Sequence, residues 1–378
     1  MTETILTNAN IVLADEVVPG TLVLRDGKIA DIARGASRSG EDMQGDFLIP
    51  GLVELHTDHL EGHYAPRPKV RWNPIASVLA HDAQVATAGI TTVFDALRVG
   101  MDYDADLGIE DMRKLADAIE DSVRQDRVRA DHFIHLRCEV SAPDCLAAFA
   151  SFEDDDCVKL ASLMDHAPGQ RQFASFDAYA MYYMGKLKMS EEAFRNYCDK
   201  RIAQSQENSA PNRAAISNAC RARGIVLASH DDATVAHVEE AIEQGIRVAE
   251  FPTTAEAAAA SKRAGLGVLM GAPNIMRGAS HSGNVSARQL AADGLLDILS
   301  SDYIPFSLIQ SAFFLGDAVE TISLPQAVAM VSKNPAEAVG LDDRGVIEAG
   351  RRADLVRVRV DDHVPVVRTV WREGRRVA

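Results

Sequence analysis

The chain has 378 residues, and 47% of them are hydrophobic, which is enough to bury a core of full size. Its 39 Lys and Arg residues against 55 Asp and Glu residues give a formal net charge of −16, which repels nucleic-acid phosphates and anionic lipids. We therefore expect neither a nucleic-acid partner nor a membrane partner. No apolar run approaches the roughly 20 residues that cross a bilayer. The opening segment MTETILTNANIVL lacks the features of a secretory signal, and the five cysteines form no CxxC pair, so a cytoplasmic location is predicted.

Both ends of the chain have the pattern of short strands. The first 50 residues alternate apolar and polar positions, and Asp26-Gly27 is a hairpin turn signal. The last 35 residues repeat this pattern, with Glu373-Gly374 at a turn. Two β-rich ends around a different middle predict a small β-sandwich domain built from both termini, residues 1–50 plus 340–378.

The middle of the chain, residues 51–339, alternates apolar strand-like runs with helical patterns, which indicates an α/β fold with parallel strands. The expected strands are residues 47–56, 90–97, 132–140, 172–178, 224–232, 245–254, 265–274 and 295–303. Eight such units predict a (β/α)8 barrel of the TIM type. The active site of this fold lies at the carboxyl ends of its strands.

Residue types that bind metals fall where these strands end. His56 and Asp58 end the first strand, Glu139 the third, His230 the fifth and Asp302 the eighth. Strand ends of a barrel meet at one mouth, so these side chains are expected to converge. Imidazole and carboxylate together suit Zn²⁺, Mn²⁺ or Fe²⁺, and a carboxylate can bridge two ions. One or two divalent ions are therefore predicted here.

Two segments resemble a known family. PGLVELHTDH is similar to the first-strand motif of the amidohydrolase superfamily, and NPAEAVGLDDRGVIEAGRRADLVRV is similar to that superfamily's return into its small β domain. Four further segments narrow the resemblance to the phosphonate-metabolism branch of this superfamily, which belongs to the carbon–phosphorus lyase pathway. They are HLRCEV, ASHDDATVAHV, EFPTTAEAA and GAPNIMRGASHSGNVSA.

The resemblance implies hydrolysis of a phosphorylated ribose phosphonate. The expected substrate is α-D-ribose 1-methylphosphonate 5-triphosphate, and the expected products are the 5-phosphate and pyrophosphate. It also implies that Asp302 is both a metal ligand and the general base that takes a proton from metal-activated water.

The chain departs from the superfamily pattern at several ligand positions. The first strand offers His-x-Asp instead of His-x-His, and no lysine is placed to become a carboxylated bridge, so Glu139 is the expected bridge. Glu250 stands on the sixth strand where many members have a histidine, which leaves Glu250, His59 and His281 as alternatives for the remaining ligand. A carboxylate at that position favours oxygen-rich coordination. Mn²⁺ and Mg²⁺ are therefore alternatives to Zn²⁺, which is the favoured ion.

A triphosphate substrate on an acidic protein requires local positive charge. Predicted substrate-binding residues follow the first, second and seventh strands, where cationic side chains can grip phosphate oxygens. They are His59, His63, Arg67, Lys69, Arg71, Arg98, Asn274, Arg277, His281 and Ser282.

Two other functions remain open from the sequence. An amidohydrolase acting on a C–N bond would keep the fold, although it needs fewer arginines. A scaffold without metal is the second alternative, and the retained acidic and imidazole groups argue against it. A homodimer is an expectation from related barrels alone.

Overall fold

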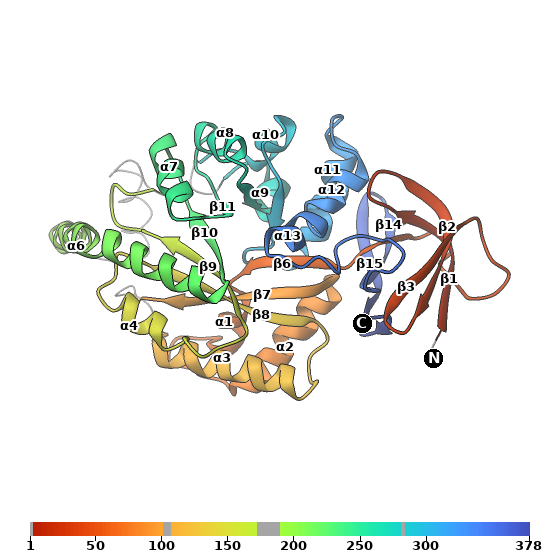
Figure 1. Ribbon diagram of the computed structural model, residues 1–378, viewed down its shortest axis with the longest axis horizontal. Helices are drawn as coiled ribbons and strands as arrows, with labels where there is room; N and C mark the ends of the chain where they lie inside the picture. The colour runs from red at the N-terminus through yellow and green to blue at the C-terminus, as the bar shows by residue number, and fades with distance from the viewer. Residues whose placement is uncertain (1–2, 101–106, 172–189, 281–283) are drawn as a thin grey trace.

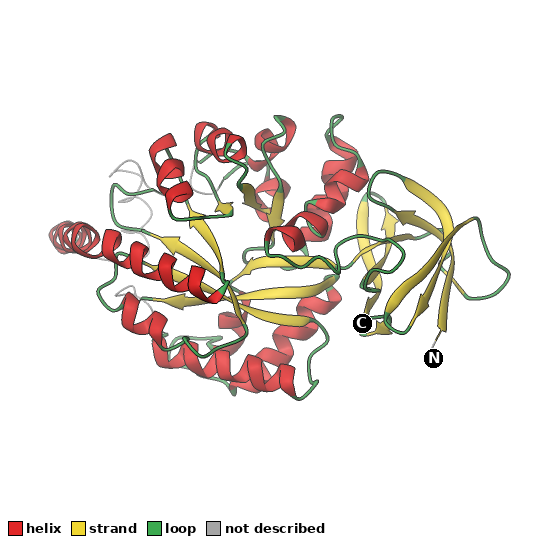
Figure 2. Cartoon of the chain, in the orientation of Figure 1, coloured by secondary structure: helices red, strands yellow, loops and turns green. Residues whose placement is uncertain are grey.

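The computed structural model describes residues 3–100, 107–171, 190–280 and 284–378. Figure 1 shows a barrel beside a separate sheet, and both chain termini lie in that sheet. Figure 2 shows helices surrounding the barrel strands, as the α/β pattern predicts. Among the described residues, no helix is long and apolar enough to cross a membrane.

The barrel is an eight-stranded sheet of parallel strands, paired in chain order within the described residues. Its strands are β6 (Leu52–Thr57), β7 (Ile90–Val99), β8 (Asp131–Glu139), β9 (Val158–Met164), β10 (Val226–His230), β11 (Val248–Glu250), β12 (Gly267–Gly271) and β13 (Ile298–Ser300). The last strand meets the first at a bridge between Thr57 and Asp302. The amide of Asp302 donates to the carbonyl of His56 over 3.1 Å, and the amide of Asp58 donates to the carbonyl of Asp302 over 3.2 Å. The predicted TIM-type barrel is confirmed, with its closure at the carboxyl ends of the strands.

The fourth strand differs from the prediction. The expected strand at 172–178 lies outside the described residues, and the strand that pairs with β8 and β10 is β9. Its sequence VKLASLM has a single β-branched residue, Val158, whereas leucine, alanine and methionine favour helices. Parallel pairing on both sides and burial override that propensity.

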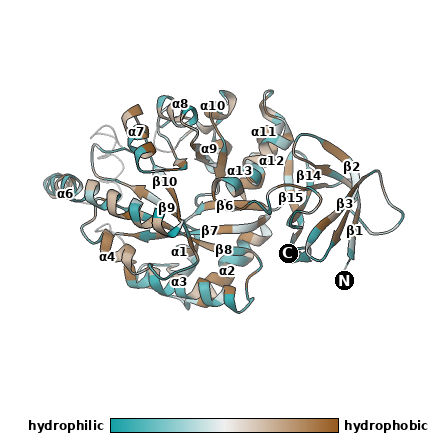
Figure 3. Cartoon of the chain, viewed as in Figure 1, coloured by the Kyte–Doolittle hydropathy of each residue, from teal (hydrophilic) through white to brown (hydrophobic). Residues whose placement is uncertain are grey.

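Helices cover the outside of the barrel. They are α1 (His59–Tyr64), α2 (Pro74–Thr87), α3 (Ile109–Arg124), α4 (Cys145–Ala150), α6 (Glu191–Arg223), α7 (Val235–Glu243), α8 (Ala255–Arg263), α9 (Ala272–Arg277), α10 (Ala287–Ala292), α11 (Ser307–Ala318), α12 (Leu324–Ala329) and α13 (Lys333–Ala338). In α3, Met112, Leu115, Ala116 and Ile119 are buried at helical spacing. Figure 3 accordingly shows both hydrophilic and hydrophobic residues on α3.

The two termini share one mixed sheet in the order β16-β15-β14-β5-β1-β2-β3, with β4 paired to β1. Its strands are β1 (Glu3–Val12), β2 (Val17–Arg25), β3 (Lys28–Arg34), β4 (Glu41–Asp42), β5 (Phe47–Pro50), β14 (Leu355–Asp361), β15 (Val364–Arg372) and β16 (Arg375–Arg376). Both predicted turns are confirmed, because Asp26-Gly27 and Glu373-Gly374 have positive φ angles between paired antiparallel strands.

The expected strand at 47–56 is divided between the two sheets. β5 pairs with β14 in the terminal sheet, and β6 begins the barrel after the single residue Gly51. A Cβ at Gly51 would lie 2.2 Å from Oγ1 of Thr91, so this close approach requires glycine. The terminal sheet is thereby tied to the strand that carries His56.

Candidate active site

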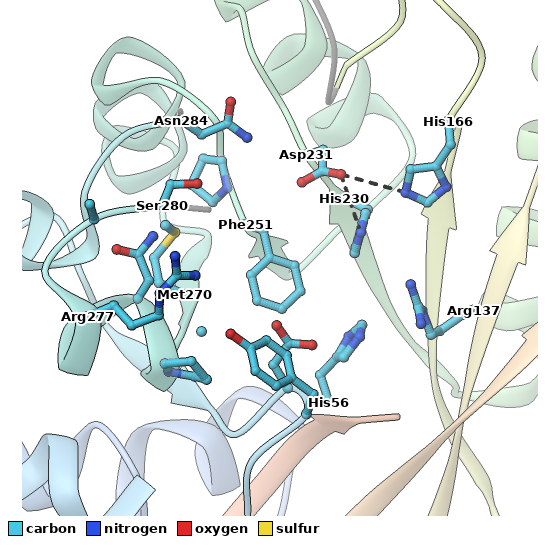
Figure 4. A pocket seen from close by; sticks show the side chains of 17 residues that line it. His56, Arg137, His166, His230, Asp231, Phe251, Met270, Arg277, Ser280 and Asn284 are labelled. Atoms are coloured by element: carbon cyan, nitrogen blue, oxygen red, sulfur yellow. Dashed lines mark ion pairs between the residues drawn. The ribbon is translucent and has the colours of Figure 1, made fainter. Parts of the chain in front are cut away.

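A cavity of about 270 Å³ lies at the carboxyl ends of the barrel strands. Figure 4 shows Arg137, His166 and His230 on one side and Arg277, Ser280 and Asn284 on the other. The remaining lining residues are His56, Asp231, Phe251, Pro252, Met270, Gly271, Pro273, Asn274, Ala279, Asp302 and Tyr303. Three of the predicted metal-site residues, His56, His230 and Asp302, therefore do converge on one cavity.

Backbone strain accompanies the strand ends around this cavity. Asp231 follows β10 with a φ of 57°, Phe251 follows β11 with a φ of 52°, and Asp302 lies beyond β13 with a φ of 55°. Aspartate tolerates this left-handed region better than most residues, but phenylalanine does not. Strained conformations of this kind persist where the surrounding structure holds a functional side chain in place.

Two groups of ligand atoms could each hold a divalent ion. His56, Asp58 and Asp302 form one group, and in each group the ligand atoms lie within 4.8 Å of one another. Oδ1 of Asp58 is buried, accepts no hydrogen bond and lies 3.8 Å from Nε2 of His56. An anionic oxygen without a hydrogen bond beside an imidazole nitrogen fits a bound cation.

The second group is His166, His230 and Asp231. Oδ2 of Asp231 is buried and makes no hydrogen bond, yet it lies 3.5 Å from Nε2 of His230 and 3.7 Å from Nε2 of His166 (Figure 4). Two imidazoles and a carboxylate make a ligand set suited to zinc and related ions. The pocket therefore offers two candidate ligand groups.

Glu250 lies behind both groups and joins them. Its Oε1 is 3.3 Å from Nδ1 of His56, and its Oε2 is 3.2 Å from Nδ1 of His230. Although burial raises the pKa of Glu250, the charge of the His56 imidazole and the hydrogen bonds from His230 and His56 hold it well below its usual range. The anion accepts from both Nδ1 atoms, which leaves both Nε2 atoms as ligands. This geometry suits a residue that orients metal-binding histidines; its predicted role as a direct ligand stays a prediction.

A third grouping of ligand atoms, His56, His135 and Glu250, is less suited to a metal. Nδ1 of His135 donates to the carbonyl of Leu55 over 2.9 Å, and Nε2 lies 2.8 Å from Oγ of Ser162. Burial lowers the pKa of His135 to about 3, so the ring is neutral and both nitrogens are already bonded.

Glu139 holds His166 in the same way. Its Oε2 accepts from Nδ1 of His166 over 2.7 Å, while Oε1 accepts from the amide of His166 and from the hydroxyl of Ser141. Burial alone raises the pKa of Glu139, but the charge of His166 and its hydrogen bond lower it to about 2. Glu139 is thus an anion that fixes His166 at the edge of the cavity. The bridging role of Glu139 between two metals stays a prediction.

Comparisons with known proteins place the chain in a family. A family model described as the amidohydrolase family matches residues 163–378. The chain is 48% identical over 377 residues to the α-D-ribose 1-methylphosphonate 5-triphosphate diphosphatase of Escherichia coli (strain K12), covering 99% of this chain and 100% of that protein. The chain belongs to the amidohydrolase family.

Solved structures show the same fold at low identity. An N-acetylglucosamine-6-phosphate deacetylase from Pasteurella multocida aligns over 99% of both chains, with a TM-score of 0.66 and 15% identity. A 5-methylcytosine deaminase from Klebsiella pneumoniae aligns over 99% of this chain and 98% of that chain, with a TM-score of 0.64 and 16% identity. At such identities the likeness concerns the amidohydrolase fold alone.

Sequence reasoning missed three ionisable residues that line the amidohydrolase pocket. His166 follows β9, the strand that was expected elsewhere. Asp231 directly follows His230, so its position next to a predicted ligand was an available signal. Arg137 lies two residues before Glu139 on β8, and alternation along a strand places the two on one face.

Arg137 lies between Asp58 of the first candidate metal group and the cavity. Its guanidinium donates to Oδ2 of Asp58 over 2.5 Å. Burial lowers the pKa of Arg137, but the Asp58 carboxylate outweighs this effect and raises it above its ordinary value. Arg137 is therefore a buried cation that both holds Asp58 and faces the cavity (Figure 4).

The predicted substrate-binding residues are only partly brought together. Asn274 and Arg277 line the cavity, whereas His281 and Ser282 lie outside the described residues. Arg98 does not line the cavity and pairs with Glu61 over 2.8 Å, and its substrate contact stays a prediction. The others that do not line this cavity are His59, His63, Arg67, Lys69 and Arg71, and their substrate contacts stay predictions.

Proposed function

We propose that the protein hydrolyses α-D-ribose 1-methylphosphonate 5-triphosphate to the 5-phosphate and pyrophosphate, a step in phosphonate utilisation. The observation that carries this proposal is the 48% identity to the Escherichia coli diphosphatase, which extends over 99% of this chain and 100% of that protein. The composition of the cavity supports it, because arginine and metal-ligand side chains face the same space.

One or two divalent ions would be held by the two candidate ligand groups. Zinc is the favoured ion, and manganese and magnesium are the alternatives. The ligands would be His56, Asp58, Asp302, His166, His230 and Asp231. Such ions, when bound, lower the pKa of water and polarise a phosphoryl oxygen. Glu250 orients His56 and His230, and Glu139 orients His166. In each ring the carboxylate binds Nδ1, so Nε2 is available to a metal.

Asp302 is the proposed general base. It lines the cavity beyond β13, and its backbone is held on both sides by hydrogen bonds to the His56 and Asp58 segment. The water oxygen forms a bond to phosphorus, the bridging P–O bond breaks, and Asp302 takes the proton as pyrophosphate leaves.

Arg137 and Arg277 supply positive charge from opposite sides of the cavity (Figure 4). A ribose triphosphate that carries a methylphosphonate is strongly anionic, and a chain with a net charge of −16 repels it unless cations are concentrated locally. Guanidinium groups suit this role because they can bind phosphate oxygens in bidentate fashion. Phe251 and Tyr303, which also line the cavity, provide apolar surface for the ribose.

Product analysis tests the proposal. The purified protein, supplied with Zn²⁺ and the triphosphate, is followed by phosphorus NMR. We expect pyrophosphate and the ribose 5-phosphate in equal amounts. Release of single orthophosphates from the end of the triphosphate would contradict the proposed bond. So would an inert triphosphate combined with ammonia release or ring opening from cyclic amides.

A further inference from the structure

Three histidines meet on the outside of the barrel, between α1 and α2. His59 and His63 lie one helical turn apart on α1, and His81 comes from α2. One ring nitrogen from each lies within 4.8 Å of the other two. The ring centroids are 4.9 Å apart for His59 and His63, and about 6 Å from each of these to His81. None of the three lines the catalytic cavity, so the cluster is a separate feature.

The hydrogen bonds of the cluster leave ring nitrogens available. Nδ1 of His59 and Nδ1 of His81 are both buried and have no hydrogen-bond partner among the described residues. Nε2 of His63 lies 3.2 Å from the amide oxygen of Gln84, which leaves the other nitrogen of that ring. Buried polar atoms without partners are rare, and a bound water or ion is one of the few explanations for them.

A buried carboxylate orients the deepest of these rings. Oδ1 of Asp95, on β7, accepts from Nε2 of His81 over 2.7 Å. Its other oxygen lies 2.7 Å from Nδ1 of His132, whose Nε2 faces Asp82. An aspartate that fixes one nitrogen of a histidine while the other is free is the usual arrangement around a metal-binding histidine.

We propose that His59, His63 and His81 form a second metal site, for a divalent transition ion of the zinc type, outside the catalytic cavity. Three neutral imidazoles suit Zn²⁺, Ni²⁺, Co²⁺ or Cu²⁺ and do not suit Mg²⁺ or Ca²⁺, which prefer oxygen. Tetrahedral zinc holds nitrogens at about 2.0–2.1 Å, so its ligands lie about 3.4 Å apart. Small rotations of the half-buried rings of His59 and His63 bring them to that spacing, and water takes the fourth position.

The ion would join α1 to α2 and, through Asp95, to the barrel strand β7. Helix α1 has only six residues, too few to be stable alone, so its position depends on contacts such as the Glu61–Arg98 ion pair and the hydrogen bond from Tyr64 to Asp111. A metal bridge from α1 to a longer helix would thus stabilise the segment that follows the first strand.

Metal counting on the whole protein tests this site. Wild type, His63→Asn and His59→Asn are loaded with Zn²⁺, dialysed and analysed by mass spectrometry for bound zinc. His63→Asn is the main variant because His63 lies five residues beyond Asp58. The control is His363→Asn, which removes an exposed histidine from the terminal sheet.

We expect wild type and His363→Asn to bind one more zinc ion per chain than His63→Asn. Equal zinc content in all the proteins would overturn the site. Should the cluster variants fail to fold, wild-type crystals soaked in zinc decide the matter by anomalous scattering. A peak among the three rings supports the site, and its absence overturns it. Neither measurement depends on the proposed diphosphatase activity.

Discussion

The carboxylate of Glu250 lies 3.3 Å from Nδ1 of His56, although 194 positions separate the two residues in the chain. The same carboxylate reaches Nδ1 of His230. One buried anion therefore sets the orientation of a histidine in each of the two candidate metal groups.

Replacing Glu250 with Gln should weaken metal binding without abolishing it. The side-chain amide of glutamine is neutral, and only its oxygen accepts hydrogen bonds, so it cannot bind both Nδ1 atoms as the carboxylate does. We therefore expect a loss of about 10- to 100-fold in metal affinity. Activity should return when excess Zn²⁺ is added. The exposed Glu243→Gln, at the end of α7, is the matched control. Complete loss of an ion that excess metal does not restore would instead make Glu250 a direct ligand.

Replacing Asp302 with Asn should abolish most turnover while the ions stay bound. Asparagine keeps the shape of the side chain but cannot accept the proton, and general-base catalysis contributes about 10²- to 10⁴-fold. Metal content and kcat are measured on the same samples, with the exposed Asp342→Asn as control. A kcat equal to wild type would remove Asp302 from the role of base.

Replacing Arg277 with Ala should weaken binding of the triphosphate more than binding of the 5-phosphate product. A lost hydrogen bond between charged groups costs about 1.5–3 kcal/mol, or roughly 10- to 150-fold in affinity. Arg67→Ala is the comparison, because Arg67 is exposed and does not line the cavity. Binding is measured by calorimetry with a non-hydrolysable analogue. A larger effect from Arg67 would place the distal phosphates outside this cavity.

His132 should make stability depend on pH above neutrality. Burial lowers its pKa, but the Asp95 charge and the hydrogen bonds to Asp82 and Asp95 outweigh burial and raise it to about 10. The folded protein then holds a proton that the unfolded chain releases near pH 6.5, so stability is full below pH 6.5 and falls as pH rises towards 10.

We expect this loss to reach at most about 1.4 kcal/mol per pH unit. Urea unfolding of wild type and His132→Asn from pH 6 to pH 10 measures it, with His363→Asn as control. The difference between wild type and His132→Asn should shrink steadily with pH. A difference independent of pH would mean that His132 is neutral in the folded protein.

Local signals in the sequence identified the parts of the site that each strand carries by itself. His56, His230 and Asp302 stand where their own strands end, and the barrel rule brings such positions to one mouth. The turns at Asp26-Gly27 and Glu373-Gly374 were also predicted, because a tight hairpin needs residues that tolerate positive φ. These features depend on a few neighbouring residues.

Other features depend on packing between distant segments. β9 has a single β-branched residue, and its pairing with β8 and β10 makes it a strand, so the position of His166, just beyond its end, could not be predicted. The substrate contacts of His59 and His63 stay predictions from the sequence, whereas their grouping with His81 of α2 arises only in the folded chain.

The sequence by itself determined the fold class and which strand ends carry ligand chemistry, because hydrophobic periodicity and turn residues act over short distances. The tertiary structure alone decided which nitrogen of each histidine is available, through contacts such as those of Glu250 and Glu139. A hydrogen bond between residues far apart in the chain leaves no periodic trace in the sequence, so this choice becomes visible only when the strands are assembled.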